Sequence, residues 1–177
     1  EHPAALINKG QWGTESLPGV KAAEYRLATK TKSGIPVYTF CMCPGGNVVP
    51  AAAFKEKSVV NGMSYYKRNG KFSNAAVVAG VHPDHLLGHT CTALEVLDWM
   101  DNLEGQFYKF SNSLEVPANM AFDYMKKRQS SEIAPVSYQR GTRSAGLYSM
   151  IPEKLSNSIS EGLGDFGRKL RGFEKGV

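Results

Sequence analysis

The sequence lacks several features that would indicate a membrane or a disulfide-stabilised protein. No apolar run approaches the roughly 20 residues that a helix needs to cross a bilayer, so we expect no membrane partner. Only three cysteines are present, Cys41, Cys43 and Cys91. Because three is odd and two of them are a single residue apart, a disulfide framework is not expected. Free thiols favour a reducing, cytoplasmic setting.

Common catalytic motifs are also missing. The chain has no phosphate-binding loop that ends in Gly-Lys-Ser/Thr, no Gly-x-Ser-x-Gly and no His-Glu-x-x-His. No dinucleotide-binding fold is expected in it. The catalytic residues are therefore unknown, and we expect the chain to be inactive by itself.

The composition is that of an ordinary globular domain. Hydrophobic residues make up 42% and charged residues 21% of the 177 positions, and the net charge is +5. The basic groups at 126–128 and 168–169 lie where helices are expected to end, and cations suit the C-terminal end of a helix dipole. Solvated helix ends explain these residues, and we expect no nucleic-acid partner.

The first half of the chain has the pattern of β-strands. Residues 23–29 alternate and residues 35–43 are rich in β-branched and aromatic side chains, so these two runs are expected to form a hairpin. A brief strand is expected to stop at Asn61–Gly62, and Asn69–Gly70 has a second turn signal. Further short strands are expected at 47–53, 58–60, 63–66 and 75–81.

The second half has helical patterns instead. Thr92 and Glu95 have the spacing of a capping box, and apolar residues then recur every three or four positions from Val96 to Phe110. A second helix is expected from Pro117 to Arg128, since proline suits the first helical position. A third helix is expected from Pro152 to Leu170.

Three glycines lie inside the third predicted helix, at positions 162, 164 and 167. Each costs the helix about 1 kcal/mol relative to alanine, so we expect this helix to depend on packing and to let another backbone come close. The fold class is therefore predicted to be α+β, with a small antiparallel sheet or barrel followed by a helical extension. Residues 1–81 form the β-rich subdomain and residues 82–177 the extension.

The most unusual stretch runs from Cys41 to Gly46, where a strand with two thiols enters a Pro-Gly-Gly turn. We expect both thiols to be buried packing residues, with Cys43 the more exposed of the two because it borders the turn. Gly45 and Gly46 indicate that the backbone passes close to a ligand or to another chain segment.

Two other stretches carry polar side chains that could form sites. Asn61–Ser64 and Ser73–Ala75 are consistent with turn chemistry or with the polar rim of a ligand pocket, and the residues alone leave both open. His82–Cys91 contains three histidines, an aspartate and a cysteine, which are ligands for soft metals. Because this segment is a predicted connector, we expect no metal site.

Several of these stretches together resemble a known family. Residues 37–46, 60–64 and 73–76, in this order, are similar to a group of bacterial FAD-dependent dehydrogenases of uncharacterised function. Glu1–Pro3 and Gln11–Gly13 match the family's entry into this region, and residues 166–173 resemble its exit. The resemblance covers nearly the whole chain.

The resemblance implies a larger flavoprotein in which this chain is an inserted substrate or cap domain. FAD would be bound by a flavin-binding domain elsewhere in the same parent chain, and the parent would be an oxidoreductase with an unknown small-molecule substrate. No FAD is expected to bind tightly to this fragment. The residues expected on the flavin or substrate side are Cys43, Pro44, Gly45, Gly46, Asn61, Gly62, Met63 and Ser64.

Two other functions are compatible with the residues. A small basic β-rich nucleic-acid-binding domain would need exposed aromatic and basic residues on one sheet face, and the only candidates are Tyr65, Tyr66, Lys67, Arg68 and Lys71. A structural or association domain would need none of the predicted site residues.

Overall fold

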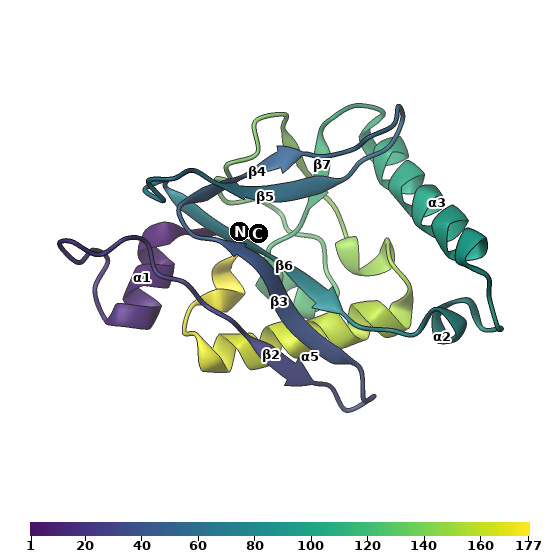
Figure 1. Ribbon diagram of the computed structural model, residues 1–177, viewed down its shortest axis with the longest axis horizontal. Coiled ribbons are helices and arrows are strands. Elements are labelled where there is room, and N and C mark those ends of the chain that lie inside the picture. The colour runs from purple at the N-terminus through teal and green to yellow at the C-terminus, as the bar shows by residue number, and fades with distance from the viewer.

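A four-stranded antiparallel sheet forms the centre of the fold in the computed structural model, which describes residues 1–177. Its strand order is β1-β6-β3-β2 (Figure 1). The strands are β1 (His2–Pro3), β2 (Ala28–Lys30), β3 (Pro36–Cys43) and β6 (Phe72–Ala79). Antiparallel pairing of β2 with β3 confirms the predicted hairpin, and the helices that follow the sheet confirm the α+β class.

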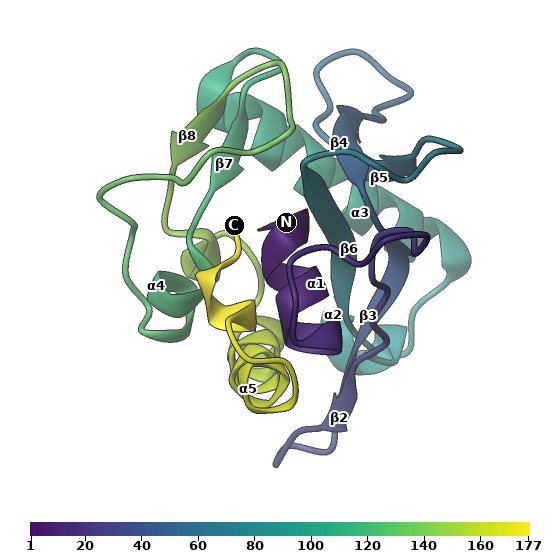
Figure 2. The same ribbon diagram turned by 90° about the vertical axis from the view of Figure 1, so that its left-hand side faces the viewer.

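Two smaller sheets flank the central one. Strands β4 (Gly46–Pro50) and β5 (Val60–Ser64) form an antiparallel hairpin, and β7 (Val116–Ala118) pairs in parallel with β8 (Thr142–Ser144). Figure 2 shows the β4–β5 hairpin and the β7–β8 pair above the two ends of the chain.

Five α-helices and two short 3-10 helices complete the structure. They are α1 (Ala4–Trp12), α2 (Pro83–Leu87), α3 (Ala93–Ser111), α4 (Ala121–Met125), α5 (Glu153–Lys169), η1 (Leu147–Ser149) and η2 (Phe173–Lys175). None of these helices combines the length and the hydrophobicity that a membrane crossing requires.

The hydrophobic core lies between α5 and one face of the sheet (Figure 1). A Cβ atom added to Gly162 would lie 2.5 Å from Cγ1 of Val37, so a glycine at this position lets α5 approach β3. Phe166 is completely buried and meets the ring of Phe173 edge to face, with centroids 5.6 Å apart. Burying a side chain of this size contributes about 1.5–3 kcal/mol. The close approach that the glycines of this helix predicted is thus confirmed at Gly162.

Two of the predicted element boundaries are wrong. Asn61 and Gly62 form no turn, because they lie inside β5 and pair with Val49 and Val48 of β4. Pro117 does not begin a helix, because it lies in β7 opposite Arg143, and the helix that follows starts only at Ala121. The predicted turn at Asn69–Gly70 is displaced, because the turn between β5 and β6 lies at 66–67 and is closed by a hydrogen bond from the Arg68 amide to the Tyr65 carbonyl at 2.9 Å.

Helix α3 lies apart from the core although its sequence is amphipathic. Its capping box is present as predicted, since the Glu95 amide donates to Thr92 Oγ1 and the Glu95 carboxylate accepts from the Thr92 amide. None of its side chains is fully buried. Two contacts with the preceding segment hold α3 in place: the Lys57 ammonium donates to the Asp101 carboxylate at 2.5 Å, and the Ser58 amide donates to the Glu104 carbonyl at 3.2 Å.

The two ends of the chain lie side by side (Figures 1 and 2). The Glu1 nitrogen donates to the Val177 carbonyl at 2.5 Å, and the Val177 amide donates to the Glu1 carbonyl at 2.9 Å. This reciprocal exchange is the pattern of a hydrogen-bonded residue pair in an antiparallel ladder.

Candidate functional site

A β-bulge in β3 places Cys41 at the surface of the sheet. Phe40 pairs with Ala76, but the next paired residues are Cys43 and Asn74, so the strand contains one extra residue between them. Cys41 has a φ of 46°, which costs a non-glycine residue about 1–2 kcal/mol. Cys41 is exposed and Cys43 is half-buried. The expectations that both thiols are buried, and that Cys43 is the more exposed, are therefore wrong, because the bulge turns Cys41 outward.

The Pro-Gly-Gly turn approaches other segments of this chain. A Cβ atom on Gly45 would lie 2.3 Å from the Arg68 carbonyl oxygen, and one on Gly46 would lie 2.3 Å from the Met63 carbonyl oxygen. The Ser64 hydroxyl also donates to the Pro44 carbonyl at 3.0 Å. Backbone contacts within the chain therefore explain both glycines.

A cleft of about 310 Å³ opens between the sheets. Twelve of its 19 lining residues are hydrophobic, but it also contains several asparagine amides, and for these we call it the polar cleft. Cys41, Asn61, Gly62 and Asn74 line it from the strands, while Asn119 lines it from the segment after β7. Asn119 is fully used by the fold, since its side chain bonds to Ser130 and Arg128.

The Asn74 side chain is the unexplained polar group of this cleft. It is 4% exposed, and its Nδ2 atom has no hydrogen-bond partner. Leaving a buried donor unpaired costs about 1–3 kcal/mol. A Cβ atom on Gly62 would lie 2.0 Å from Asn74 Oδ1, so the glycine makes room for this amide. The fold therefore tolerates a costly amide at this position, which makes Asn74 a candidate binding residue.

A second, larger cavity of about 520 Å³ lies on the core side of the sheet, and we call it the apolar cavity. Sixteen of its 23 lining residues are hydrophobic. The cavity is open to solvent on one side, since its lining residue Val60 is 44% exposed, so part of its apolar surface remains in contact with water.

The polar cleft and the apolar cavity share eight lining residues, and the paired chain ends, Glu1 and Val177, are two of them. The Glu1 carboxylate accepts hydrogen bonds from the Ser137 amide, at 2.9 Å, and from the Ser137 hydroxyl. The Val48 amide in turn donates to the Ser137 hydroxyl at 2.7 Å, so this chain of bonds ties β1 to β4.

His2 lies in the wall of the apolar cavity and is 4% exposed. Its Nε2 atom lies 2.7 Å from the Phe173 carbonyl oxygen, which identifies Nε2 as the protonated nitrogen. The Nδ1 atom is buried and has no partner. Burial lowers the pKa of His2 from 6.5 to about 4, so the ring is neutral near pH 7.

The structure separates the eight residues predicted on the flavin side into three groups. Asn61 and Gly62 line the polar cleft, while Pro44, Gly45 and Gly46 are buried in the turn. The other three are Cys43, whose thiol pKa is raised by burial, the exposed Met63 and the half-buried Ser64. Asn74 was part of the possible polar rim in the sequence, whereas Cys41 was not among the eight predicted residues.

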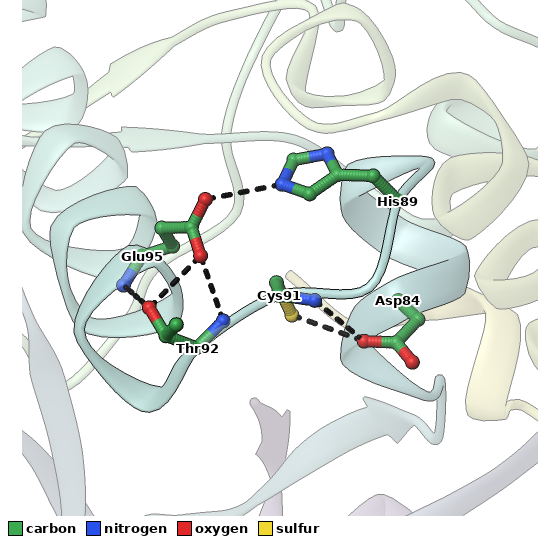
Figure 3. A network of polar contacts seen from close by, with 5 residues as sticks. All are labelled: Asp84, His89, Cys91, Thr92 and Glu95. Atoms are coloured by element: carbon green, nitrogen blue, oxygen red, sulfur yellow. Dashed lines mark hydrogen bonds and ion pairs between the residues drawn. The ribbon is translucent and has the colours of Figure 1, made fainter.

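The histidine-rich connector is used to cap helices (Figure 3). The Cys91 amide and thiol donate to the Asp84 carboxylate, at 3.0 and 3.3 Å. The His89 ring lies 3.2 Å from the Glu95 carboxylate, and the Thr92 amide donates to the same carboxylate at 2.7 Å. Hydrogen bonds from Thr92 and His89 lower the pKa of Glu95 to about 2. No group of three such side chains is arranged to hold a metal ion.

Two of the aromatic and basic residues near the β5–β6 turn interact with other side chains of this chain. Tyr66 is 90% exposed, and the Lys21 ammonium lies 5.0 Å from the centroid of its ring. Arg68 forms an ion pair with Glu24.

Gly162, Gly164 and Gly167 have the Gly-x-Gly-x-x-Gly spacing of a dinucleotide-binding turn, but their position in the fold excludes that role. All three lie inside α5, whereas the motif binds pyrophosphate in the turn between a strand and a helix. Gly162 also packs against Val37 of the core. The structure therefore contains no site that fits the pyrophosphate of FAD at these glycines.

Two comparisons with known proteins bear on this geometry. Residues 1–176 match the family model described as FAD-dependent protein, C-terminal domain-like. The chain is also 35% identical over 182 residues to an uncharacterised protein of Clostridium beijerinckii (strain ATCC 51743 / NCIMB 8052). This match covers 99% of the chain but 33% of the relative, so the chain spans about a third of the length of that curated relative.

Proposed function

This chain belongs to the FAD-dependent protein, C-terminal domain-like family, and on that premise we propose that it is the substrate-side cap domain of an FAD-dependent oxidoreductase. In this proposal the domain is inserted into a longer chain whose other parts bind FAD. The flavin supplies the hydride chemistry, while this domain orients the substrate and excludes water.

The single observation that carries the proposal is the cleft in which the buried Asn74 amide has no hydrogen-bond partner. The cleft adjoins the apolar cavity, since the two share lining residues. In the proposal, the flavin-binding domain lies beside the cleft and the cavity. Active sites commonly form where two domains meet in this way.

The surface around the polar cleft suits contact with a ring system. Phe40 and Met63 are each 57% exposed, and Phe40 lines the cleft beside Cys41 and Asn61. Exposed apolar side chains next to polar groups are typical of interaction surfaces. In the proposal, the amides of Asn61 and Asn74 hydrogen-bond to heteroatoms of the flavin ring or of the substrate.

The proposal is tested in a full-length family protein that carries this domain. Asn61→Ala should shift the visible absorption bands of the bound flavin, because those bands respond to hydrogen bonds and polarity near the ring. Asn157→Ala is the matched control, since Asn157 is an exposed residue of α5 that lines neither the polar cleft nor the apolar cavity.

A flavin spectrum that is identical in wild type, Asn61→Ala and Cys41→Ser would contradict the cap-domain proposal. A role in structure or association alone predicts that result. Thermal unfolding of each variant should be measured alongside, so that a loss of folding is not mistaken for a change at the flavin.

A further inference from the structure

We propose that the apolar cavity binds a small, largely apolar molecule that carries no negative charge. The cavity would hold the apolar part of the substrate, a role that rests on the function proposed above. Binding itself requires only residues of this chain, so it can be tested without flavin.

The size of the apolar cavity matches that of a small organic ligand. Its volume is about 520 Å³, within the range of ligand pockets. Cavities of roughly 150 Å³ with a similar aliphatic and aromatic lining bind benzene. The apolar cavity therefore has room for a molecule with two or three fused or linked rings.

Apolar side chains close the cavity from several directions. The sheet, α3 and α5 each contribute two of them, which are Ala75, Val77, Leu103, Phe107, Ile159 and Leu163. Leu103 and Phe107 belong to the apolar stripe of α3, and both are only half-buried. The apolar stripe of α3 predicted a helix that faces the core, but in the structure this stripe faces the apolar cavity. This position explains why α3 buries none of its side chains.

The few charged groups of the lining determine which ligands are excluded. The charged side chains of the lining residues are those of Glu1 and Glu104, with no lysine or arginine, and the N-terminal ammonium of Glu1 is engaged by the Val177 carbonyl at 2.5 Å. A ligand carboxylate would lose its hydration near two side chains of the same charge, without a cationic side chain to replace the water. A hydroxyl group is matched instead, because a carboxylate can accept its hydrogen bond.

The test uses two probes with the same carbon skeleton, naphthaleneethanol and naphthaleneacetate. Both are titrated into the 177-residue chain at pH 7, and binding is followed through the methyl resonances of Ala75, Val77 and Leu163. We expect the alcohol to shift these resonances in a saturable manner, and the carboxylate to bind at least about tenfold more weakly.

Two blocking variants from opposite walls locate the binding. Leu103→Trp on α3 and Ala121→Leu on α4 each place additional atoms in the cavity. Leu97→Trp is the matched control, because Leu97 is an exposed residue of the same helix as Leu103. We expect both blocking variants to weaken binding of the alcohol at least about tenfold, while the control binds it as the wild type does.

Three results would overturn the proposal. They are the absence of saturable shifts with the alcohol, equal or tighter binding of the carboxylate, and unchanged binding in folded blocking variants. Because the methyl shifts are measured on the wild-type chain, they decide the question even where a variant does not fold. A failure of the cap-domain proposal would appear in the flavin spectra and would leave these shifts unchanged.

Discussion

Acidification from pH 7 to pH 4 should destabilise this domain through one residue, His2. In the folded chain the neutral His2 ring donates from Nε2 to the Phe173 carbonyl, and its Nδ1 atom is buried without a partner. Protonation would place a charge and an unpaired N–H group at Nδ1. Unfolding would hydrate both, so acid favours the unfolded state.

The size of the effect follows from the two pKa values. The pKa of His2 is about 4 in the folded chain and 6.5 in the unfolded chain. Because the folded value is the lower one, the unfolded state binds more protons between these pH values. The stabilisation is complete above pH 6.5 and declines as the pH falls to about 4, by about 3 kcal/mol in total.

The assay is denaturant unfolding of the 177-residue chain at pH 7, 6, 5 and 4, together with NMR titration of the histidine rings. His2→Gln retains a donor for the Phe173 carbonyl but does not titrate, so its stability should vary much less over this range. His85→Gln is the matched control, because it removes an exposed histidine and should leave the wild-type pH dependence intact.

Two outcomes would refute this reasoning. One is a His2 ring that titrates near 6.5 in the folded chain. The other is a pH dependence that His2→Gln does not reduce. In either case the buried, unpaired Nδ1 atom would not control protonation at this position.

Three further predictions concern the helices and the cofactor. Gly162→Ala should destabilise the chain by about 1–2 kcal/mol in denaturant unfolding, because the added methyl group would lie 2.5 Å from Val37. Gly164→Ala should be neutral or stabilising by up to about 1 kcal/mol, because its methyl group would make only an ordinary contact with Met125 at 3.8 Å. Equal effects of the two changes would contradict the packing argument. Thr92→Ala should cost about 0.5–2 kcal/mol and speed amide exchange in the first turn of α3, and unchanged exchange there would show that the cap is dispensable. The purified 177-residue chain should be colourless and should not retain FAD on gel filtration, and a yellow, stoichiometric complex would contradict this.

The sequence predicted the elements whose signals are local. The capping box at Thr92 and Glu95 begins α3 as expected, and the long apolar stripe of α5 packs on the sheet. In α5 the pattern and the packing favour the same structure, since residues three and four positions apart share one face of a helix, whereas α3 is predicted by its cap and its periodicity alone.

The prediction failed where a contact distant in sequence determines the local structure. Asn61 and Gly62 have a turn signal, but pairing with β4 keeps them in a strand, and Gly62 is small because the Asn74 amide lies against it. The bulge at Cys41 follows from the register of β3 with β6, which no local pattern encodes. The sequence left open a polar rim formed by residues 61–64 and 73–75, and Asn61 and Asn74 do line the polar cleft, but the wall formed by residues 116–119 is distant in sequence and could not be predicted.

The hydrogen-bonded pair of Glu1 and Val177 also has a consequence within the cap-domain proposal, in which the domain is inserted into a longer chain. Segments that exchange backbone hydrogen bonds are as close as the two strands of a hairpin, so the insertion would open a gap in the longer chain no wider than that of a tight turn. The loop-closure entropy of the longer chain would then depend on this narrow gap rather than on the 177 residues between the two positions. Under the same proposal, the domain could be exchanged for another with a similarly paired entry and exit, and substrate recognition could change while the rest of the chain kept its fold.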